Sequence, residues 1–322
     1  MKAIQVEGDD LVWGDAPEPE LGVGQVRIEV HATAVNRADL VQRSGGYPPP
    51  PGASDILGLE CAGTVLEVGE GVTRVSTGDP VCALLAGGGY AEQVVVPAGQ
   101  VLPIPVGLDM QQAAAIPEVF ATAYLNLFME ADLQKAERVL LHAGASGVGT
   151  AAIQLCKAFH SPCFVTVGGD DKVERCLALG AEGGFNRHNG DFLPAVRDWA
   201  GEGGVDVVLD PVGAAYFAQN LACLGLGGRL VLIGLLGGLE TEVNLGVLMM
   251  KRLRVVGSTL RARPVAEKSL VMDALRDRVW PLLESGDIKP IVEAVMPVQE
   301  TDRAHRLIAS NDTVGKVIIQ IR

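Results

Sequence analysis

The sequence lacks the cysteine and histidine spacings of a structural metal site. Its 322 residues include six cysteines and five histidines, which form no CxxC pair and no HxxxH pair. Tetrahedral zinc in proteins is usually held by such closely spaced ligands, so we expect no metal. The wide spacing of the cysteines also argues against a disulfide framework.

Positive charge and long apolar runs are scarce as well. Lysine and arginine number 26 against 39 aspartates and glutamates, which gives a net charge of −13. Because nucleic-acid binding depends on basic side chains at the phosphates, we expect no nucleic-acid partner. No apolar run reaches the roughly 18 residues of a membrane-spanning helix, and residues 1–10 do not look like a targeting peptide. We expect a soluble, cytoplasmic protein with no membrane partner.

The strand and helix patterns change character part-way along the chain. Residues 1–115 contain short strand-like runs between Gly/Pro turns, which is typical of an antiparallel barrel or sandwich. These runs lie at 3–6, 26–30, 63–68, 81–85 and 90–96. A helical stretch over 111–130, interrupted at Pro117, leads to apolar strands that alternate with helices. Such alternation indicates a doubly wound parallel sheet.

The chain is longer than most single hydrophobic cores allow, which favours two domains. The last strand-like run, 316–321, has no sheet of its own nearby, so we expect it to return to the first domain. The predicted fold class is therefore α/β. Its first domain comprises 1–118 and is completed by 262–322, and a nucleotide-binding domain covers 119–261.

A glycine-rich loop joins a predicted strand to a predicted helix. The strand at 138–143 runs directly into Gly144, Ala145, Ser146, Gly147, Val148 and Gly149. Gly144 permits a tight turn, Gly149 lets the helix pack on the strand, and the amides at the helix start face a pyrophosphate. Ser146 holds the place of the usual middle glycine. Strand, loop, helix and second strand in this order favour nucleotide binding over a purely structural turn.

The end of the second strand predicts which nucleotide is bound. An acidic residue there would bind the ribose hydroxyls of NAD, but this chain has Gly168. The space left by a small residue and the positive charge of Lys172 and Arg187 favour the 2′-phosphate of NADPH. Asp170 and Asp171 argue the other way unless they point to solvent. We predict NADPH as the cofactor.

Four segments together resemble the quinone oxidoreductase (zeta-crystallin-like) branch of the medium-chain dehydrogenase/reductase family, and most of all its tumour-suppressor-inducible members. The segments are 34–40, 45–52, 56–60 and 142–155. The resemblance implies a GroES-like β-barrel domain beside a Rossmann domain. Zinc-dependent members carry a cysteine at the position of Asn36 and a histidine at that of Leu59, so it also implies zinc-independent chemistry.

The implied activity is hydride transfer from NADPH to a quinone in an interdomain cleft. Without a Lewis acid, the acceptor must itself be electrophilic, and the oxygen that gains charge needs hydrogen-bond donors. The resemblance places Asn36 and Tyr47 at the nicotinamide pocket as leading catalytic candidates. Ser146 is a further catalytic candidate, and Thr122 matches a position near the nicotinamide.

The resemblance also implies cofactor contacts at the carboxyl ends of strands, where open sheets bind ligands. Besides the glycine loop, Gly168, Lys172 and Arg187, these are Val212, Gly213, Ile233, Gly234, Leu260, Arg261 and Arg263. His142, at the end of the first strand beside the loop, is a further candidate for cofactor binding. Simpler interpretations stay open at this point. Asn36 suits a cap or turn, Tyr47 suits packing on the prolines that follow it, and His142 suits packing or a ribose contact. Asp39 and Glu60 suit structural hydrogen bonds, to backbone amides or to an arginine such as Arg43.

Two other functions remain as alternatives. A 2-alkenal or enone reductase needs the same hydride geometry plus a proton donor. Relatives in the zeta-crystallin group also serve as lens proteins or bind RNA, so an NADPH-binding crystallin-like or RNA-binding protein is the alternative from another class, although the net charge opposes the RNA role. The apolar run 253–258 is a candidate sheet edge, and we expect a homodimer formed through it.

Overall fold

The computed structural model describes residues 1–8 and 10–322. The chain divides into two compact units, which are described separately. Unit 1 comprises Met1–Ala121 and Leu260–Arg322, and unit 2 comprises Thr122–Thr259. All six cysteines are buried free thiols. Among the described residues, none of the helices has both the length and the apolar character needed to cross a membrane.

Unit 2 is built on a six-stranded sheet in which every neighbouring pair is parallel. Its spatial order is β10-β9-β8-β11-β12-β13. The strands are β8 (Val139–His142), β9 (Cys163–Val167), β10 (Gly183–Asn186), β11 (Val205–Asp210), β12 (Leu224–Leu232) and β13 (Arg254–Gly257). The central strands are buried on both faces, as parallel strands between helices must be. This confirms the predicted doubly wound sheet.

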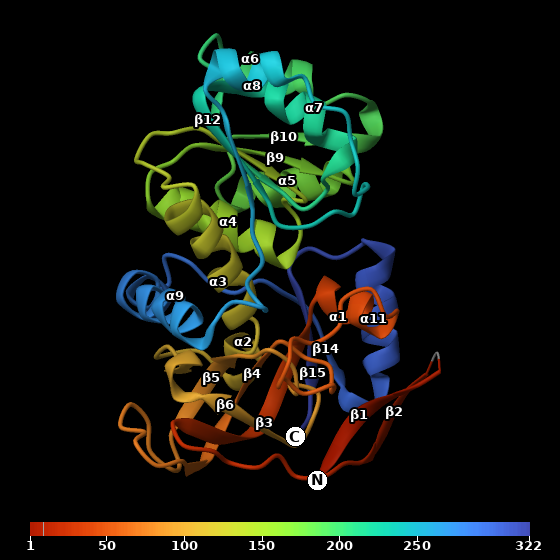
Figure 1. Cartoon of the computed structure of the whole chain (residues 1–322), viewed down its shortest axis with the longest axis vertical. Coiled ribbons are helices and arrows are strands. Elements are labelled where there is room, and N and C mark those ends of the chain that lie inside the picture. Colours follow the sequence, from red (N-terminus) through yellow and green to blue (C-terminus); the bar gives the residue numbers. More distant parts are fainter. Residues whose placement is uncertain (9) are drawn as a thin grey trace. The chain divides into compact units, whose positions relative to one another are not determined.

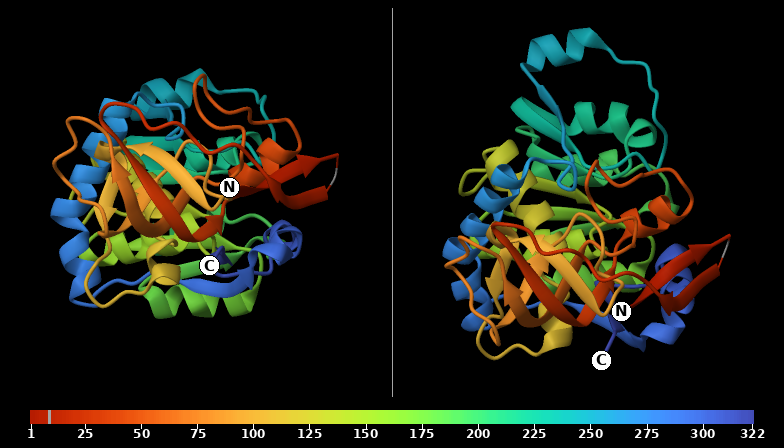
Figure 2. Two further views of the ribbon diagram at one scale, coloured as in Figure 1. Left: turned by 90° about the horizontal axis from the view of Figure 1, so that it is seen from below. Right: turned by 60° about the horizontal axis from the view of Figure 1, so that its bottom comes forward.

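Helices connect these strands and cover the sheet (Figure 1). They are α4 (Gly147–Ala158), α5 (Asp170–Leu179), α6 (Leu193–Ala200), α7 (Ala214–Cys223) and α8 (Leu245–Lys251). Side chains of α6 and α7 share one apolar core with β8, β9, β11 and β12. Helices α4 and α5 contact each other and pack on β8, β9 and β10. Figure 2 shows the segment that leads to α8 as a long loop at the rim of this unit.

Unit 1 is built on a mainly antiparallel sheet and a separate two-stranded hairpin. The hairpin pairs β1 (Lys2–Glu7) with β2 (Asp10–Asp15). The sheet order is β14-β15-β3-β4-β5-β7, and β6 pairs with β3. Its strands are β3 (Gln25–Val35), β4 (Glu60–Val68), β5 (Pro80–Leu84), β6 (Gln93–Pro97), β7 (Val101–Pro103), β14 (Val292–Pro297) and β15 (Lys316–Gln320). The C-terminal strand β15 therefore lies antiparallel to β3, with Val317 opposite Val35.

Short helices complete unit 1 and lead into unit 2. They are α1 (Arg37–Arg43), α2 (Met110–Ala113), α3 (Pro117–Tyr124), α9 (Val265–Arg278), α10 (Trp280–Glu284) and α11 (Thr301–Ser310). The helical stretch expected over 111–130 is α2, α3 and a π-helical turn, Leu125–Glu130, and Pro117 begins α3. Proline suits this place because the first turn of a helix needs no N–H there.

Several elements have no counterpart among the runs read from the sequence: β2, β7, β10, β14, α6 and α8. Strand β10 contains the pair Gly183-Gly184, and glycine weakens the usual strand pattern. Its close pairing with β9 requires glycine, because a Cβ at Gly183 would lie 2.6 Å from the ring of Phe164.

Candidate functional site

The glycine loop of unit 2 lies at the carboxyl end of β8 and opens helix α4. A Cβ at Gly144 would lie 2.6 Å from Val165, and one at Gly149 would lie 2.4 Å from the carbonyl oxygens of Ala143 and Gly144. Both positions therefore exclude a side chain. Ser146 caps the helix by accepting a hydrogen bond from the Gly149 amide at 3.0 Å. The start of α4 thus presents backbone amides in the arrangement that binds phosphate groups.

Basic side chains lie at the carboxyl end of β9. A Cβ at Gly168 would be 3.5 Å from Nε and 3.6 Å from Nη2 of Arg187, and 3.7 Å from Nε2 of His188. The carboxylate of Asp170 instead accepts a hydrogen bond from Nδ2 of Asn186 at 3.0 Å. Lys172, on α5, is largely buried. Gly168 therefore leaves space beside the exposed Arg187, while the Asp170 carboxylate is hydrogen-bonded to Asn186.

A buried chain of hydrogen bonds crosses three neighbouring strands beneath the loop. Asn220 on α7 donates from Nδ2 to Oδ2 of Asp210 at 2.8 Å, so its Oδ1 accepts from Nε2–H of His142 at 2.7 Å. Nδ1 of His142 then accepts from the hydroxyl of Thr166 at 2.8 Å. Burial lowers the pKa of His142 to about 4, against an opposing effect of the Asn220 bond. The imidazole is neutral and fully engaged within the protein.

Asp210 carries this hydrogen-bond chain to the loop that follows β11. Its Oδ1 accepts from the Val212 amide at 2.6 Å, and both carboxyl oxygens accept from the Gly213 amide at 3.2 Å. The backbone N–H of Ile233, which follows β12, donates to the carbonyl oxygen of Asp210 at 2.9 Å. A Cβ at Gly234 would lie 2.8 Å from the backbone oxygen of Pro211. The predicted cofactor residues after β8, β9, β11 and β12 therefore gather along one edge of the sheet.

In unit 1, Asn36 belongs to a buried charged network. Lys316 on β15 donates to Oδ1 of Asn36 at 2.6 Å and forms an ion pair with Oε1 of Glu60 at 2.8 Å. Nδ2 of Asn36 donates to the same Glu60 oxygen at 2.9 Å and to the Ala34 carbonyl at 3.4 Å. The Lys316 and Glu60 side chains are 4% and 0% exposed. Asn36 must therefore give up one of these bonds before its amide can donate to an acceptor.

Asp39 links this region to α11 through Tyr90. The Asp39 carboxylate accepts from the backbone amides of Asn36 at 2.7 Å and Gly58 at 3.1 Å, and from the Tyr90 hydroxyl at 3.2 Å. Nε2 of His305 lies 3.1 Å from the same hydroxyl. Burial raises the pKa of Asp39 to about 6, against the effect of these hydrogen bonds. Asp39 therefore holds backbone amides, whereas Arg43 pairs with Asp302 at 2.8 Å.

Tyr47 lies against Arg261. The guanidinium carbon is 5.2 Å from the centre of the tyrosine ring, and Nη1 donates to the Tyr47 carbonyl at 3.2 Å. Arg261 also donates to the Ala86 carbonyl and to Gln42, both at 2.8 Å. The Tyr47 hydroxyl has no hydrogen bond to any residue in 1–8 or 10–322. Arg261 therefore fixes the ring, and the hydroxyl is available to a ligand.

Two neighbouring candidates differ from Arg261 in their surroundings. Leu260 is buried in unit 1, and Arg263 pairs with Glu267 at 3.1 Å near the surface. Thr122, the first residue of unit 2, lies on α3, where its carbonyl accepts from Nδ2 of Asn126 at 2.8 Å.

Glu118, on α3, is a further ionisable residue of unit 1, and it interacts with Glu60 and Tyr47. Its backbone amide donates to Oε2 of Glu60 at 2.9 Å. Burial, then the charge of Glu60, raises the pKa of Glu118 to about 8, while Lys316, among other groups, lowers it. The charge of Glu118 also raises the pKa of Tyr47, after the larger effect of burial. Glu118 and Tyr47 therefore lie within electrostatic reach of each other.

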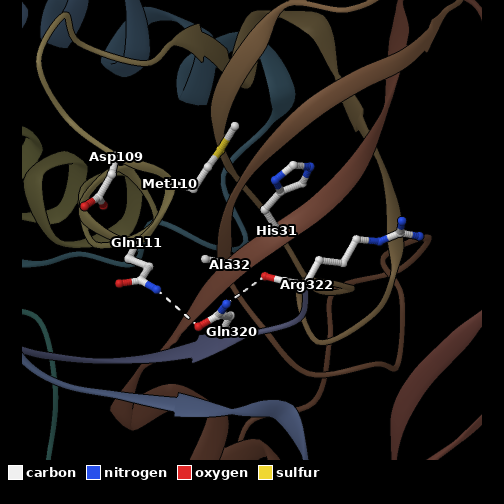
Figure 3. A pocket seen from close by; sticks show the side chains of 7 residues that line it. All are labelled: His31, Ala32, Asp109, Met110, Gln111, Gln320 and Arg322. Carbon is white, nitrogen blue, oxygen red and sulfur yellow. Dashed lines mark hydrogen bonds between the residues drawn. The ribbon is translucent and has the colours of Figure 1, made fainter.

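A separate pocket of about 340 Å³ opens elsewhere in unit 1 (Figure 3). Its lining comprises His31, Ala32, Asp109, Met110, Gln111, Gln320 and Arg322. Gln111 donates to Gln320, and Gln320 donates to the Arg322 carbonyl. None of the residues predicted for catalysis or cofactor binding lines it, so it is set apart from the candidate site.

Two family models match the chain. Residues 22–106 match the "alcohol dehydrogenase GroES-like domain", and residues 147–276 match "zinc-binding dehydrogenase". The quinone oxidoreductase of Rattus norvegicus is 31% identical over 297 residues, which cover 92% of this chain and 88% of that protein. The chain belongs to the zinc-independent quinone oxidoreductase branch of the medium-chain dehydrogenase/reductase family. It is therefore an oxidoreductase of the kind that uses a nicotinamide cofactor.

Solved structures agree over the full length. The crystal structure of Escherichia coli quinone oxidoreductase complexed with NADPH matches with a TM-score of 0.87 at 30% identity, covering 99% of both chains. A structure described as an NAD-dependent alcohol dehydrogenase matches with a TM-score of 0.86 at 31% identity and complete coverage of both chains. This oxidoreductase thus combines a GroES-like unit 1 with a Rossmann unit 2.

The residues of unit 2 fit a nicotinamide dinucleotide. The side-chain-free positions Gly144 and Gly149 and the amides that begin α4 form a cradle that a Cβ would fill. In unit 1, Asn36 is hydrogen-bonded within its network and Leu59 is a buried apolar residue. Within the part of the chain that the structure describes, no three His, Cys, Asp or Glu side chains are grouped as metal ligands.

Lys316, Glu118 and Asn220 were not identified as site residues from the sequence. The sequence contains one signal for Lys316: it is a charged residue directly before the apolar run Val317-Ile318-Ile319. Glu118 and Asn220 lie in predicted helices, where a single polar residue is usually exposed. Their roles depend on which strands become neighbours, and that information is not local in sequence.

Proposed function

We propose that this reductase transfers hydride from NADPH to a quinone. The observation that carries the cofactor choice is the convergence of Arg187 and His188 on Gly168, where an acidic residue would otherwise select NAD. The hydrogen bond between Asn186 and Asp170 supports the same choice, because it occupies one of the two carboxylates that begin α5.

The residues proposed to hold NADPH are those gathered at the sheet edge of unit 2. The amides of Gly147 to Gly149 bind the pyrophosphate, and Arg187 binds the 2′-phosphate with Lys172 as a more distant positive charge. Thr122, Val212, Gly213, Ile233 and Gly234 contact the remainder, and Ser146 fixes the loop. In unit 1, Arg261 acts mainly by holding Tyr47. Leu260, next to it in the chain, and Arg263, near the surface, are proposed as peripheral cofactor contacts. When bound, NADPH supplies a hydride and its electron pair.

Equilibrium binding tests the cofactor choice. We expect the wild-type protein to bind NADPH at least about tenfold more tightly than NADH, as a charge-assisted phosphate contact gives. The substitution Arg187→Ala should weaken NADPH binding about tenfold and leave NADH unchanged. Arg197→Ala, an exposed arginine on α6, is the matched control. Tighter binding of NADH by the wild-type protein would overturn the choice.

In unit 1 the proposed acceptor site is formed around Tyr47. Its hydroxyl makes no hydrogen bond to any described residue, and Arg261 holds the ring in place. We propose that Tyr47 donates a hydrogen bond to the acceptor oxygen that gains charge. Asn36 joins it if its amide exchanges the Ala34 carbonyl, the longer of its two contacts, for the acceptor.

Steady-state kinetics test the reaction. A panel of quinones is compared with a panel of 2-alkenals and enones at saturating NADPH, and the proposal requires higher kcat/KM for the quinones. Tyr47→Phe should lower kcat about tenfold while leaving the dissociation constant of NADPH unchanged. Higher kcat/KM for the enals would replace the quinone assignment with the enone reductase.

We also propose that the protein is a homodimer. The exposed apolar side chains Leu245, Met249 and Met250, 71% to 75% exposed, lie on α8, and Val255 lies on the edge strand β13. In the described chain β13 pairs only with β12, so its other edge is open to a second copy. Light scattering should give twice the chain mass, and Met249→Asp should shift the protein toward monomer. A monomeric wild-type mass contradicts the proposal.

A further inference from the structure

One carboxyl oxygen of Glu118 is left unsatisfied inside unit 1. Glu118 lies in the first turn of α3, where its backbone amide binds Glu60 at 2.9 Å. Its own Oε2 is buried and has no hydrogen-bond partner in residues 1–8 and 10–322. Native proteins leave few buried polar atoms unpaired, and each exception points to a ligand, a water molecule or a catalytic role.

The surroundings of Glu118 keep its carboxyl group protonated at neutral pH. Burial, then the charge of Glu60, raises the pKa of Glu118 to about 8. Lys316 opposes this only partly, because its ammonium already donates to Val35, Asn36 and Glu60. Glu60 in turn accepts from three donors, so its negative charge is fixed beside Glu118.

A protonated Glu118 carries a hydrogen-bond donor, and its buried Oε2 has no hydrogen-bond partner within the described chain. An oxygen of a bound molecule is the partner that satisfies such a donor. The residue as a whole keeps partial exposure, although its Oε2 is buried. The site is therefore set up to meet an incoming oxygen.

The groups within electrostatic reach of Glu118 include Tyr47 and Arg261 of the proposed acceptor site. Its charge raises the pKa of Tyr47, after the larger effect of burial. The pKa of Arg261 is lowered by burial, and Tyr47, Asp39 and Glu118 oppose that shift. Tyr47, Arg261 and Glu118 therefore lie within electrostatic reach of one another, and Glu60 joins the Glu118 backbone amide to the side chain of Asn36 by hydrogen bonds.

We propose that Glu118 is the proton donor of the reduction, with its carboxyl O–H directed at the acceptor oxygen. The inference rests on the function proposed above. As the acceptor takes up the hydride, a new C–H bond forms at a carbon conjugated with the carbonyl. The π pair of the C=C bond shifts toward the carbonyl carbon, the carbonyl π bond breaks and its electron pair moves to the oxygen. The O–H bond of Glu118 then breaks and a new O–H bond forms on the acceptor. The Glu118 carboxylate that remains recovers a proton from water after the product leaves.

Kinetics of Glu118→Gln test the proposal, since glutamine keeps the size of the side chain and removes the acid. We expect kcat for the quinone to fall about 100-fold, the usual contribution of a positioned general acid. The dissociation constant of NADPH should stay within about twofold. In the wild-type protein kcat/KM should fall above pH 8 as Glu118 ionises, and this limb should be missing in the variant. Glu18→Gln, an exposed glutamate of unit 1, is the matched control.

A second readout does not depend on turnover. Infrared titration of the cofactor-free protein should show a protonated carboxyl band that disappears near pH 8 and is absent from Glu118→Gln. If that variant does not fold, Glu118→Asp serves instead: it retains an acid, so a shifted band is expected.

The outcomes separate the two claims. If Glu118→Gln reduces quinones as fast as the wild type does, with the same pH profile, the proton-donor proposal is overturned and the proposed function stands. A wild-type protein that reduces no quinone and no enone overturns the function and the proton donor together. A carboxyl group at Glu118 that is already ionised at pH 6 overturns the proton donor whatever the turnover.

Discussion

The two units each contain a buried polar network, and the two networks differ in charge. The network of unit 1 joins Lys316, Glu60 and Asn36 around a buried ion pair. That of unit 2 joins Thr166, His142, Asn220 and Asp210, and its histidine is neutral. A buried ion pair fixes an electric field beside a reacting group, whereas a chain of hydrogen bonds through neutral side chains that ends at a single carboxylate chiefly fixes geometry. We therefore assign acceptor chemistry to the first network and cofactor positioning to the second.

The largest expected effect comes from removing the cation of the unit 1 network. Lys316→Met leaves the Glu60 carboxylate buried without its counter-charge, which should lower the free energy of unfolding by about 3–5 kcal/mol. Urea unfolding measures this, with Lys2→Met on an exposed lysine of the same unit as the control. A loss no larger than that of the control would mean that the ion pair contributes nothing to stability.

Acid should act on unit 2 through His142. Its pKa is about 4 in the folded protein, below the usual 6.5, so between these values the unfolded chain binds the proton and the folded one does not. The stability that the neutral His142 ring contributes is present above pH 6.5 and is lost as the pH falls through 4. The loss in the free energy of unfolding is up to about 3 kcal/mol. His305, whose pKa burial also lowers to about 4, acts in the same direction in unit 1.

His142→Gln isolates the unit 2 share of this acid sensitivity. The variant should lose less stability than the wild type when urea unfolding is compared at pH 7 and pH 4. His188→Gln, an exposed histidine, should behave as the wild type does. Equal acid sensitivity in the wild type and His142→Gln would show that the His142 ring is not held neutral by its surroundings.

The link between the two halves of the unit 2 network is Asn220. Asn220→Ala leaves Nε2–H of His142 unpaired and removes the shorter of the two hydrogen bonds to Oδ2 of Asp210, so the free energy of unfolding should fall by about 2 kcal/mol. Because Asp210 holds the amides of Val212 and Gly213, NADPH should also bind about tenfold more weakly. Unfolding and cofactor titration check both parts. Unchanged binding in a destabilised variant would make the network structural only.

The smallest loss of stability is expected for a substitution at Thr166, the end of the unit 2 network farthest from Asp210. Thr166→Val keeps the shape of the side chain and removes the hydroxyl that donates to His142. The expected loss is about 1 kcal/mol, with NADPH binding unchanged. Urea unfolding measures it, and a loss as large as that of Asn220→Ala would show that the network acts as one unit.

The parallel sheet and the glycine loop of unit 2 could be predicted because their signals are local. Alternating apolar strands and helices and the spacing of Gly144 and Gly149 are visible in short windows of sequence. The polar networks could not be predicted in the same way. Lys316 and Glu60 are separated by most of the chain and meet only because β15 pairs with β3, which in turn pairs with β4.

The candidate site residues could likewise be predicted only in part, because their partners are distant in sequence. Asn36 and Tyr47 were selected by resemblance, yet their partners Lys316 and Arg261 come from the C-terminal part of unit 1. The environment of Glu118 likewise depends on Glu60 and Lys316 together. A pKa set by burial and by long-range charge cannot be read from the residues next to it in sequence.

The dissociation constant of NADPH, measured by fluorescence titration for Glu118→Gln and Asn220→Ala beside the wild type, tests the division of roles between the networks most directly. The assignment predicts a change within about twofold for Glu118→Gln and about a tenfold increase for Asn220→Ala. Weakened NADPH binding in Glu118→Gln together with unchanged binding in Asn220→Ala would contradict it.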